Sequence, residues 1–253
     1  MAGFTLFLSF DLDVDSAEAL KGEDPVARSR GLFAERAGLA KVLDVLERHG
    51  VKATFFVPGW VAARYPHLVR AITKRGHEVA AHGFMHERLD TLNREDEMRV
   101  FELAEHMIKH VTGSRPLGFR APYWRWSSST LEIVAKRGYL YDSSLMDDEK
   151  PYVIEHAGHK VVELPVDWRL DDWPYLEYYR TLTPRELLEM WIDEIDYAAS
   201  TGGYVSLTMH PQCIGRGARI RVLDSILRRA RELGAWLPRG SELARSVLGS
   251  GDS

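Results

Sequence analysis

The stretch Phe4-Thr-Leu-Phe-Leu-Ser-Phe-Asp-Leu-Asp-Val-Asp15 sets the architecture of this chain, because an apolar run ends in closely spaced carboxylates. The seven residues from Phe4 to Phe10 are mostly apolar or aromatic and predict a buried strand. Asp11 and Asp13 follow directly, so they lie at the carboxyl end of this strand. The run is far too short to span a membrane, since a spanning helix needs roughly 20 apolar residues.

Short apolar strands alternate with amphipathic helices along the next part of the chain. Apolar residues recur at helical spacing from 39 to 49, residues 51–57 predict a second strand, a helix follows over 61–74, and a third strand ends at Ala81. A final strand is predicted over residues 203–209. This alternation favours a parallel sheet covered by helices.

Several candidate catalytic or metal-binding residues follow predicted strands. They are Asp11, Asp13, His82, Arg120 and His210. In α/β barrels, catalytic residues and ligands occupy the loops at the carboxyl ends of the strands, so we expect these side chains to meet at one end of the sheet. The pattern alone does not separate an incomplete (β/α) barrel from an open doubly wound sheet.

Helix starts can also be located in the sequence. Asn93 predicts the start of a long helix, residues 129–132 form a capping box, and residues 183–186 combine an N-cap, a proline and a glutamate at a third start. A last helix over about 220–233 leads to a short closing strand at 235–237.

His82 and His86 stand four residues apart in Ala-Ala-His-Gly-Phe-Met-His-Glu. Two imidazoles at this spacing can bind one ion, and the carboxylate of Asp13 would complete a three-ligand set with positions open for water. We expect one divalent metal ion, with Zn favoured and Co or Mn as alternatives. The spacing by itself also fits two unrelated surface histidines, since the chain has ten histidines.

The composition bounds the class of protein. With 253 residues, 45% of them hydrophobic and 28% charged, the chain suffices for one α/β domain with a substantial core. The net charge is −4 without a basic block, so we expect neither a nucleic-acid partner nor a membrane. The single cysteine, Cys213, predicts no internal disulfide, and the N-terminus has no signal-peptide pattern, so we expect a cytoplasmic protein.

Five short motifs occur in order: Phe10-Asp-Leu-Asp13, the pair His82 and His86, Arg120-Ala-Pro-Tyr123, the segment from Asp167 to Trp173, and Leu207-Thr-Met-His210. Together they resemble the polysaccharide deacetylase family, whose members share the NodB homology domain and are carbohydrate esterase family 4-like. The resemblance points to the branch of peptidoglycan deacetylase-like, allantoinase-like and cyclic imidase-like proteins. It implies a distorted or incomplete (β/α) barrel of about seven units. We expect one catalytic domain over residues 1–248 and a disordered tail over 249–253.

Asp11 is the candidate general base, because a carboxylate beside an activated water can accept its proton. In the family, the base and the metal-binding aspartate usually stand side by side, whereas here Leu12 separates Asp11 from Asp13. A similar spacing occurs in the branch named above. Asp15 is an alternative participant, and we prefer to interpret it as an N-cap or loop carboxylate.

The resemblance assigns further roles around the Arg120-Ala-Pro-Tyr123 motif. Arg120 would orient the catalytic aspartate through its planar guanidinium. The backbone N–H of Tyr123 would help to stabilise the tetrahedral oxyanion. Trp124 and Trp173 adjoin motif residues and are candidates for an aromatic substrate surface.

His210 is the candidate general acid, because an amide nitrogen is a poor leaving group until it is protonated. The resemblance implies that an acidic residue of the 167–173 segment supports this histidine. Asp171 is our assignment, and Asp167 and Asp172 compete for the role.

We therefore expect a metal-dependent hydrolase of carbon-nitrogen bonds other than peptide bonds, similar to polysaccharide or peptidoglycan N-deacetylases. The alternative is a cytoplasmic amidohydrolase for cyclic imides or allantoin-type amides, which the missing export signal favours. A non-catalytic binding module is a lesser alternative, because candidates for base, ligands and acid are all present. The expected partner is a small-molecule amide or an N-acetylated sugar. The resemblance also favours a homo-oligomer, such as a tetramer, with contacts near Trp191 and in a loop over about 146–159.

Overall fold

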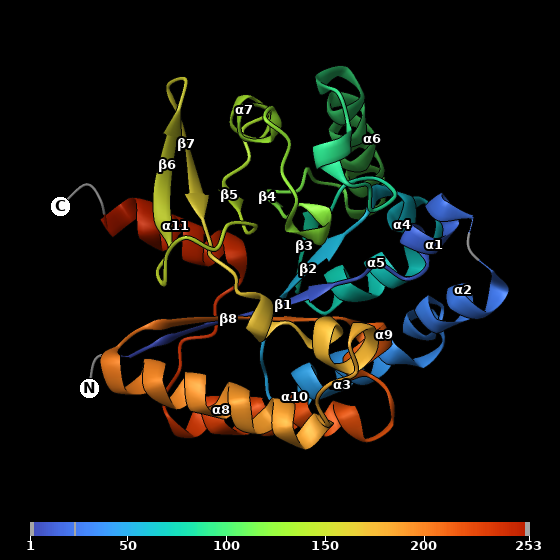
Figure 1. The fold of residues 1–253 in the computed structure, drawn as a ribbon. Coiled ribbons are helices and arrows are strands. Elements are labelled where there is room, and N and C mark those ends of the chain that lie inside the picture. Colours follow the sequence, from blue (N-terminus) through green and yellow to red (C-terminus); the bar gives the residue numbers. More distant parts are fainter. Residues whose placement is uncertain (1–2, 23, 251–253) are drawn as a thin grey trace.

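The centre of the molecule is one curled sheet of eight strands. The computed structural model describes residues 3–22 and 24–250, and its strands lie in the order β6-β7-β5-β4-β3-β2-β1-β8 (Figure 1). The strands are β1 (Thr5–Asp11), β2 (Thr54–Val57), β3 (Glu78–Ala81), β4 (Gly118–Phe119), β5 (Tyr141–Asp142), β6 (Tyr152–His156), β7 (His159–Glu163) and β8 (Tyr204–Met209). Neighbouring strands pair in parallel, except that β6 and β7 form an antiparallel hairpin at one edge.

Helices surround the sheet, which forms a half-barrel, and the predicted fold class is confirmed. The helices are α1 (Ser16–Lys21), α2 (Pro25–Gly31), α3 (Leu39–Arg48), α4 (Gly59–Arg64), α5 (Pro66–Lys74), α6 (Arg94–Thr112), α7 (Thr130–Lys136), α8 (Pro184–Thr201), α9 (Pro211–Ile214), α10 (Ile220–Glu232) and α11 (Gly240–Ser250). Two π-helical turns, η1 (Ala34–Gly38) and η5 (Pro174–Tyr178), lie next to α3 and before α8. No helix in the described ranges is long and apolar enough to cross a bilayer.

Side chains alternate along β1, and this alternation divides the strand between two environments. Leu8 and Phe10 join the main apolar core beneath the helices. Phe7 points to the inner face, where it packs in a second cluster with residues of α11. Asp11 lies on the same face as Phe7, four residues further on. The inner face is therefore apolar at one end, where α11 closes it, and polar at the carboxyl ends of the strands.

The hairpin of β6 and β7 adds an eighth strand, β6, that pairs antiparallel with β7, while the other seven strands pair in parallel, in keeping with the expected barrel of about seven units. Most of it falls in the predicted loop over 146–159, so that prediction is wrong. The side chains of β6 alternate between half-buried and exposed, and the segment therefore lacks the continuous apolar run of a buried strand. Trp191 is also placed differently from the prediction, because it is fully buried in the core of this chain and its indole N–H donates to the Arg169 carbonyl.

Two predictions of helix boundaries need correction. The predicted helix over 61–74 is two helices that break at Tyr65, because Pro66 disfavours helical geometry in the residue before it. The predicted capping box at 129–132 does not form: Ser129 makes no side-chain cap, and the Glu132 carboxylate accepts from Arg94 and Lys136 instead.

The chain end also differs from the prediction. The closing strand is reduced to a single bridge between Trp236 and Thr5. Helix α11 continues to Ser250, so the expected tail does not begin at residue 249. Residues 251–253, the remainder of that tail, lie outside the described residues.

The predicted cap of α8 is present, and its removal should destabilise the protein. The Thr183 hydroxyl accepts from the Glu186 N–H, and the Glu186 carboxylate accepts from the Thr183 N–H. We expect Thr183→Ala to lower the free energy of unfolding by about 1 kcal/mol in a urea titration. Glu186→Gln keeps an acceptor at N3 and serves as the control, with a smaller loss expected. Equal losses in the two variants would contradict this account of the cap.

Candidate active site

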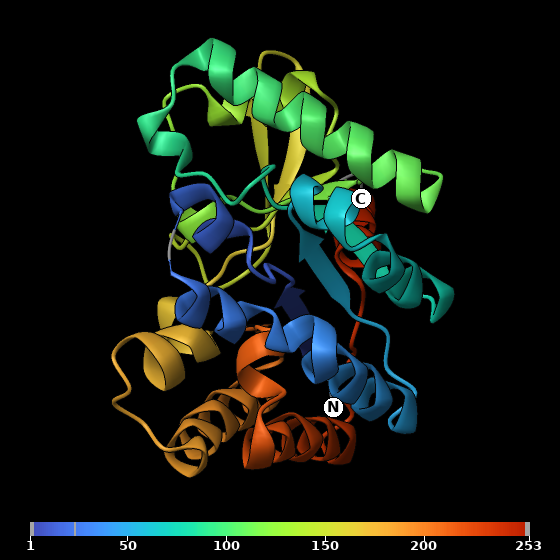
Figure 2. The ribbon, with the colours of Figure 1, turned by 90° about the vertical axis from the view of Figure 1, so that its right-hand side faces the viewer.

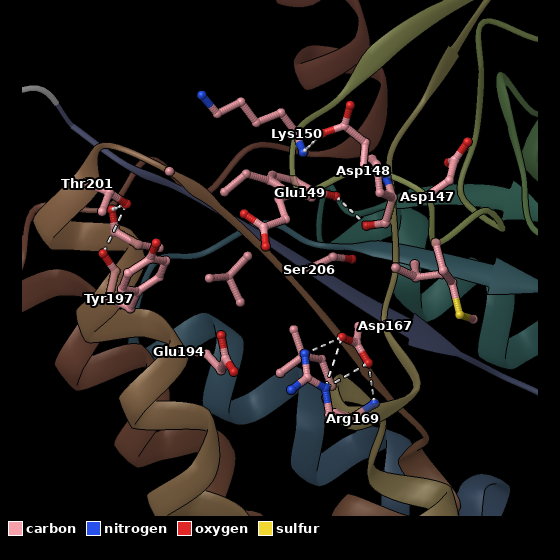
Figure 3. Close-up of a pocket in the computed structure, with 18 residues that line it drawn as sticks. Asp147, Asp148, Glu149, Lys150, Asp167, Arg169, Glu194, Tyr197, Thr201 and Ser206 are labelled. Carbon is pink, nitrogen blue, oxygen red and sulfur yellow. Dashed lines mark hydrogen bonds and ion pairs between the residues drawn. The ribbon is translucent and has the colours of Figure 1, made fainter.

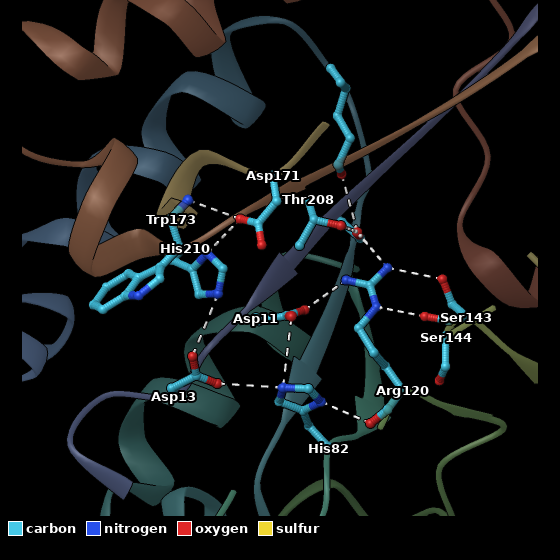
Figure 4. Close-up of polar contacts among 12 residues, drawn as sticks. Asp11, Asp13, His82, Arg120, Ser143, Ser144, Asp171, Trp173, Thr208 and His210 are labelled. Carbon is cyan, nitrogen blue, oxygen red and sulfur yellow. Dashed lines mark hydrogen bonds and ion pairs between the residues drawn. The ribbon is translucent and has the colours of Figure 1, made fainter. Parts of the chain in front are cut away.

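The candidate residues meet at the carboxyl ends of adjacent parallel strands (Figure 4). Asp11 ends β1, while His82, Arg120 and His210 directly follow β3, β4 and β8. Parallel pairing aligns these strand ends, which brings residues almost 200 positions apart in the sequence into contact. All of these side chains are buried, and so is that of Asp13.

Leu12 explains how Asp11 and Asp13 converge although they are not adjacent in sequence. Its side chain is fully buried in the main core, and its N–H donates to the Phe56 carbonyl of β2. The two flanking carboxylates therefore both face the inner side of the sheet. Asp15 lies away from them, where it accepts from Arg28 and from the hydroxyl of Tyr65.

Asp13, His82 and His86 form one of two groups among the described residues that could hold a metal ion; the other is Asp171, Asp172 and His210. The Asp13 Oδ1 atom lies 3.7 Å from Nε2 of His82 and 3.7 Å from Nε2 of His86. One ligand atom of each residue lies within 4.8 Å of the others. Oδ1 of Asp13 is buried and has no hydrogen-bond partner within residues 3–22 and 24–250. Two imidazoles, a carboxylate and an unpaired buried oxygen fit a divalent ion.

The loop after β3 holds both histidines in place. Gly83 has φ +66°, and a Cβ there would meet Pro122 at 3.0 Å, so this turn requires glycine. The Glu87 carboxylate accepts from the N–H groups of Phe84 and Met85, which fixes the next residues. His86 itself has φ 62°. The sequence prediction did not include Glu87, because its role lies in the loop and not in the histidine spacing.

The histidine rings are prepared for ligation. His82 Nδ1 lies 2.8 Å from the Arg120 carbonyl, to which it donates, and Nε2 is left with its lone pair facing Asp13. Burial lowers the pKa of His82 to about 4 and the pKa of His86 well below its usual value. Both rings are therefore neutral at neutral pH, as metal ligation requires. Burial also raises the pKa of Asp13 to about 7.

Asp11 belongs to a buried network around Arg120. The Arg120 guanidinium donates to Asp11 at 2.7 Å, to the Ser9 hydroxyl at 3.0 Å and to the Ser143 hydroxyl at 2.9 Å. The guanidinium also lies over the Phe56 ring, 4.0 Å from its centre. Burial opposes a low pKa at Asp11, but Arg120 and the histidines outweigh it, so the pKa falls below its usual value. Asp11 is therefore a charged carboxylate with one edge free of Arg120.

His210 approaches the same centre from β8, on the side opposite Arg120 (Figure 4). Its Nε2 lies 3.6 Å from Asp13 Oδ2, while Nδ1 lies 2.8 Å from Asp172 Oδ1. Asp171 is further from Nδ1, at 3.4 Å, and accepts from the Trp173 N–H. The shorter contact with Nδ1 thus belongs to Asp172, a competing candidate from the sequence, while Asp171, our assignment, also lies within ion-pair distance.

The charge of His210 follows from these neighbours. Burial opposes its protonation, but Asp171 and Asp172 outweigh burial and raise the pKa of His210 well above its usual value. Burial raises the pKa of Asp171 itself to about 8. Asp167, the third candidate, forms an exposed ion pair with Arg169 and does not reach His210.

Aromatic side chains border the site. The Tyr123 ring lies 4.3 Å from the His86 ring and is 39% exposed, and the Trp173 ring lies 5.5 Å from that of His210. Tyr123 and Trp124 both have positive φ, at 57° and 50°, in the turn η3 (Pro122–Trp124). Strained backbone of this kind is common at functional sites. Cys213 is fully buried, and burial raises the pKa of its thiol, as expected for a residue that is not a nucleophile.

A separate cavity of about 490 Å³ lies beside α8 and β8 (Figure 3). Its lining includes Asp167, Arg169 and Ser206, but none of the strand-end residues that form the candidate site. The Asp167 ion pair therefore belongs to this second cavity.

Comparison with known proteins places the chain in a family. The model of the family described as "Polysaccharide deacetylase" matches residues 31–141. A peptidoglycan deacetylase of Helicobacter pylori is 30% identical over 260 residues, which cover 88% of this chain and 89% of that protein. The chain belongs to the polysaccharide deacetylase family, a family of hydrolases, and the predicted resemblance is confirmed.

Solved structures agree with this assignment. The crystal structure of a putative polysaccharide deacetylase from Mycobacterium smegmatis is 31% identical and superposes with a TM-score of 0.91, covering 99% of this chain and 92% of that one. The crystal structure of Puue allantoinase, 21% identical, superposes with a TM-score of 0.92 and covers 99% of this chain and 92% of that one. This second likeness concerns the fold alone.

Arg120→Lys should impair turnover without abolishing folding. A lysine keeps the positive charge but cannot reach Asp11, Ser9 and Ser143 at once, because it lacks the planar fork of donors. We expect kcat to fall about 10²-fold, since a small displacement of a catalytic group has an effect of this size. Arg169→Lys, at an exposed ion pair outside the site, is the control. A kcat of Arg120→Lys equal to that of the control would show that Asp11 needs no such positioning.

Asp172→Asn should shift the pH profile. Because the pKa of His210 is raised, the protonated acid persists above its ordinary titration near pH ~6.5, and turnover is lost only as the pH rises through the raised pKa. Removal of the Asp172 charge lowers that pKa, so the basic limb of kcat should move to lower pH. The pH dependence of kcat would be measured beside Asp167→Asn. An unmoved basic limb in Asp172→Asn would contradict a role of Asp172 in raising the pKa of His210.

Proposed function

We propose that this chain is a metal-dependent hydrolase that removes the acetyl group from N-acetylated amino sugars by cleavage of their amide bond. The observation that carries the proposal is the convergence of a candidate ligand set, Asp13, His82 and His86, with a charged carboxylate and a protonated imidazole on either side. An amide hydrolase needs a water activated on one side of the carbonyl and a proton donor for nitrogen on the other.

Asp13, His82 and His86 would hold the ion, and Zn, Co and Mn all suit this ligand set. Bound there, a divalent ion would polarise the amide carbonyl and lower the pKa of a water molecule. Asp11 accepts the proton of the attacking water, because its pKa is low and its carboxylate is charged at neutral pH. Arg120 holds Asp11 in one orientation through the hydrogen bond at 2.7 Å.

His210 donates a proton from Nε2 to the leaving nitrogen. Asp172 fixes the ring, since it accepts from both Nδ1 and the backbone N–H of His210. The Nδ1 hydrogen bond also ensures that a proton lost from the imidazolium leaves from Nε2, which faces Asp13. Tyr123 and Trp173 border the opposite sides of the site and would exclude water from the bound substrate.

The choice of an N-acetylated sugar draws support from the relative in Helicobacter pylori, which is named as a peptidoglycan deacetylase. A second candidate is hydrolysis of a cyclic imide or allantoin-type amide. It is motivated by the Asp11-Leu12-Asp13 spacing, in which Leu12 is buried and both carboxylates still converge. The same base, ligands and acid would serve either amide.

His86→Ala should lose both bound metal and turnover. The variant removes one of three ligands, and a site of two ligands binds a divalent ion far more weakly. Metal content would be measured by mass spectrometry after equilibration with Zn²⁺, Co²⁺ or Mn²⁺, beside hydrolysis assays. His67→Ala is the control, because His67 is exposed and pairs with Glu35 away from the site. Full metal content and turnover in His86→Ala would sink the proposal.

The two candidate functions separate in the same assay. Acetate release from N-acetylglucosamine oligomers identifies an N-deacetylase. Ring opening of succinimide or allantoin without acetate release identifies a cyclic-amide hydrolase. Retained metal with no hydrolysis of any of these amides would favour the binding-module alternative.

A further inference from the structure

A groove of about 790 Å³ lies beside the candidate active site, between α2, η5 and the segment after α9. In Figure 2 these parts are the blue helices, the gold turn and the orange helix that adjoin one another. Four arginines line the groove: Arg30, Arg36, Arg216 and Arg219. The lining acids are Asp24 and Glu177, so the lining carries a formal excess of two positive charges.

The two acids neutralise this cluster only in part. Asp24 is the N-cap of α2, and its carboxylate accepts from the N–H groups of Val26 and Ala27. Glu177 is buried and is shared by Arg219 and, at 3.8 Å, by Arg30. Nε of Arg30 is buried and has no hydrogen-bond acceptor among the described residues. The Arg30 side chain is 34% exposed, and an oxyanion would supply an acceptor for its unpaired N–H.

Two of the guanidinium groups, those of Arg216 and Arg219, are held in place before any ligand binds. Arg216 donates to the backbone carbonyls of Gln212 and Arg30, both at 3.0 Å, and lies over the Phe33 ring at 4.3 Å. Arg219 donates to the Leu176 carbonyl at 3.3 Å. Planar donors fixed in this way bind carboxylate and phosphate groups with a smaller loss of side-chain entropy.

Trp173 connects the groove with the active site. The Trp173 ring contacts both regions. Its centre lies 5.5 Å from the centre of the His210 ring and 5.3 Å from the Arg30 guanidinium. A substrate whose amide lies at His210 would therefore extend past Trp173 toward the arginines. The catalytic steps proposed above use none of these four arginines.

We propose that the groove lined by Arg30, Arg36, Arg216 and Arg219 is a subsite for a carboxylate or phosphate group of the substrate. The substrate class is then an amide that carries an oxyanion beyond the bond that is cleaved. This inference rests on the proposed hydrolase function, but its binding part can be tested separately.

Binding would be measured first, with inorganic phosphate as the probe and isothermal titration calorimetry of the metal-loaded protein. Arg36 is exposed and has no ion-pair partner within the described residues, so Arg36→Gln should fold normally. We expect Kd for phosphate to rise about tenfold in Arg36→Gln and further in a double variant with Arg216→Gln, since charged hydrogen bonds are lost. Arg221→Gln, an exposed arginine of α10 outside the groove, is the matched control and should bind as the wild type does.

Kinetics would then separate the two sources of the oxyanion. N-acetylglucosamine, N-acetylglucosamine 6-phosphate and N-acetylmuramic acid share one acetamido group but differ in charge. Dihydrouracil and dihydroorotate form the corresponding cyclic pair, which differs by one carboxylate. We expect KM for the preferred anionic compound to rise about tenfold in Arg36→Gln, with KM for its neutral partner unchanged.

The outcomes distinguish this inference from the proposed function. Phosphate binding that is equal in wild type, Arg36→Gln and the double variant overturns the subsite, even where a neutral amide is hydrolysed. Weakened phosphate binding in the variants, with no hydrolysis of any amide, supports an anion site and overturns the proposed function instead. An equal rise of KM for charged and neutral substrates in Arg36→Gln would also overturn the subsite.

Discussion

The buried guanidinium of Arg120 is the constraint on which the site depends. A fully buried positive charge costs several kcal/mol unless it is paired and hydrogen-bonded, so its partners must be placed with little freedom. Those partners come from β1, through Ser9 and Asp11, and from the segment after β5, through Ser143. One side chain thus ties together three strand ends, and the carbonyl of Arg120 also orients His82.

This arrangement gives two nearby carboxylates different properties. Asp11 has its countercharge inside the protein, and its pKa is lowered despite burial. Asp13 lies beside the neutral imidazoles of His82 and His86, and its Oδ1 has no hydrogen-bond partner among the described residues. Burial raises the pKa of Asp13 to about 7, although His210 on its other side opposes this rise. The carboxylate that is already neutralised is suited to move a proton. The carboxylate that still requires a positive partner is suited to bind a cation.

The sequence predicted the parts of the site that depend on parallel strands. Asp11, His82, Arg120 and His210 each follow an apolar run, and parallel pairing alone brings such residues together. Strand pairing did not predict which aspartate supports His210. Asp171 and Asp172 are adjacent in the sequence, and both carboxylates approach the His210 ring, at 3.4 Å and 2.8 Å, so the strand pattern could not rank them. The hairpin of β6 and β7 was not predicted from the sequence. The side chains of β6 are half-buried or exposed, so this strand lacks the apolar run by which buried strands are recognised.

Membership of the family defines the reaction centre more closely than the substrate. The motifs that carry the resemblance are short segments at strand ends, and they supply the candidate base, acid and metal ligands. Substrate contacts come from elsewhere, because loops between such motifs can vary without disturbing the sheet. Arg30, Arg36 and Arg216 lie outside all five motifs, and Trp173 ends one of them. The charge of the groove beside Trp173 therefore lies outside the segments that carry the resemblance, and the proposed subsite would constrain the substrate in a way that the motifs do not.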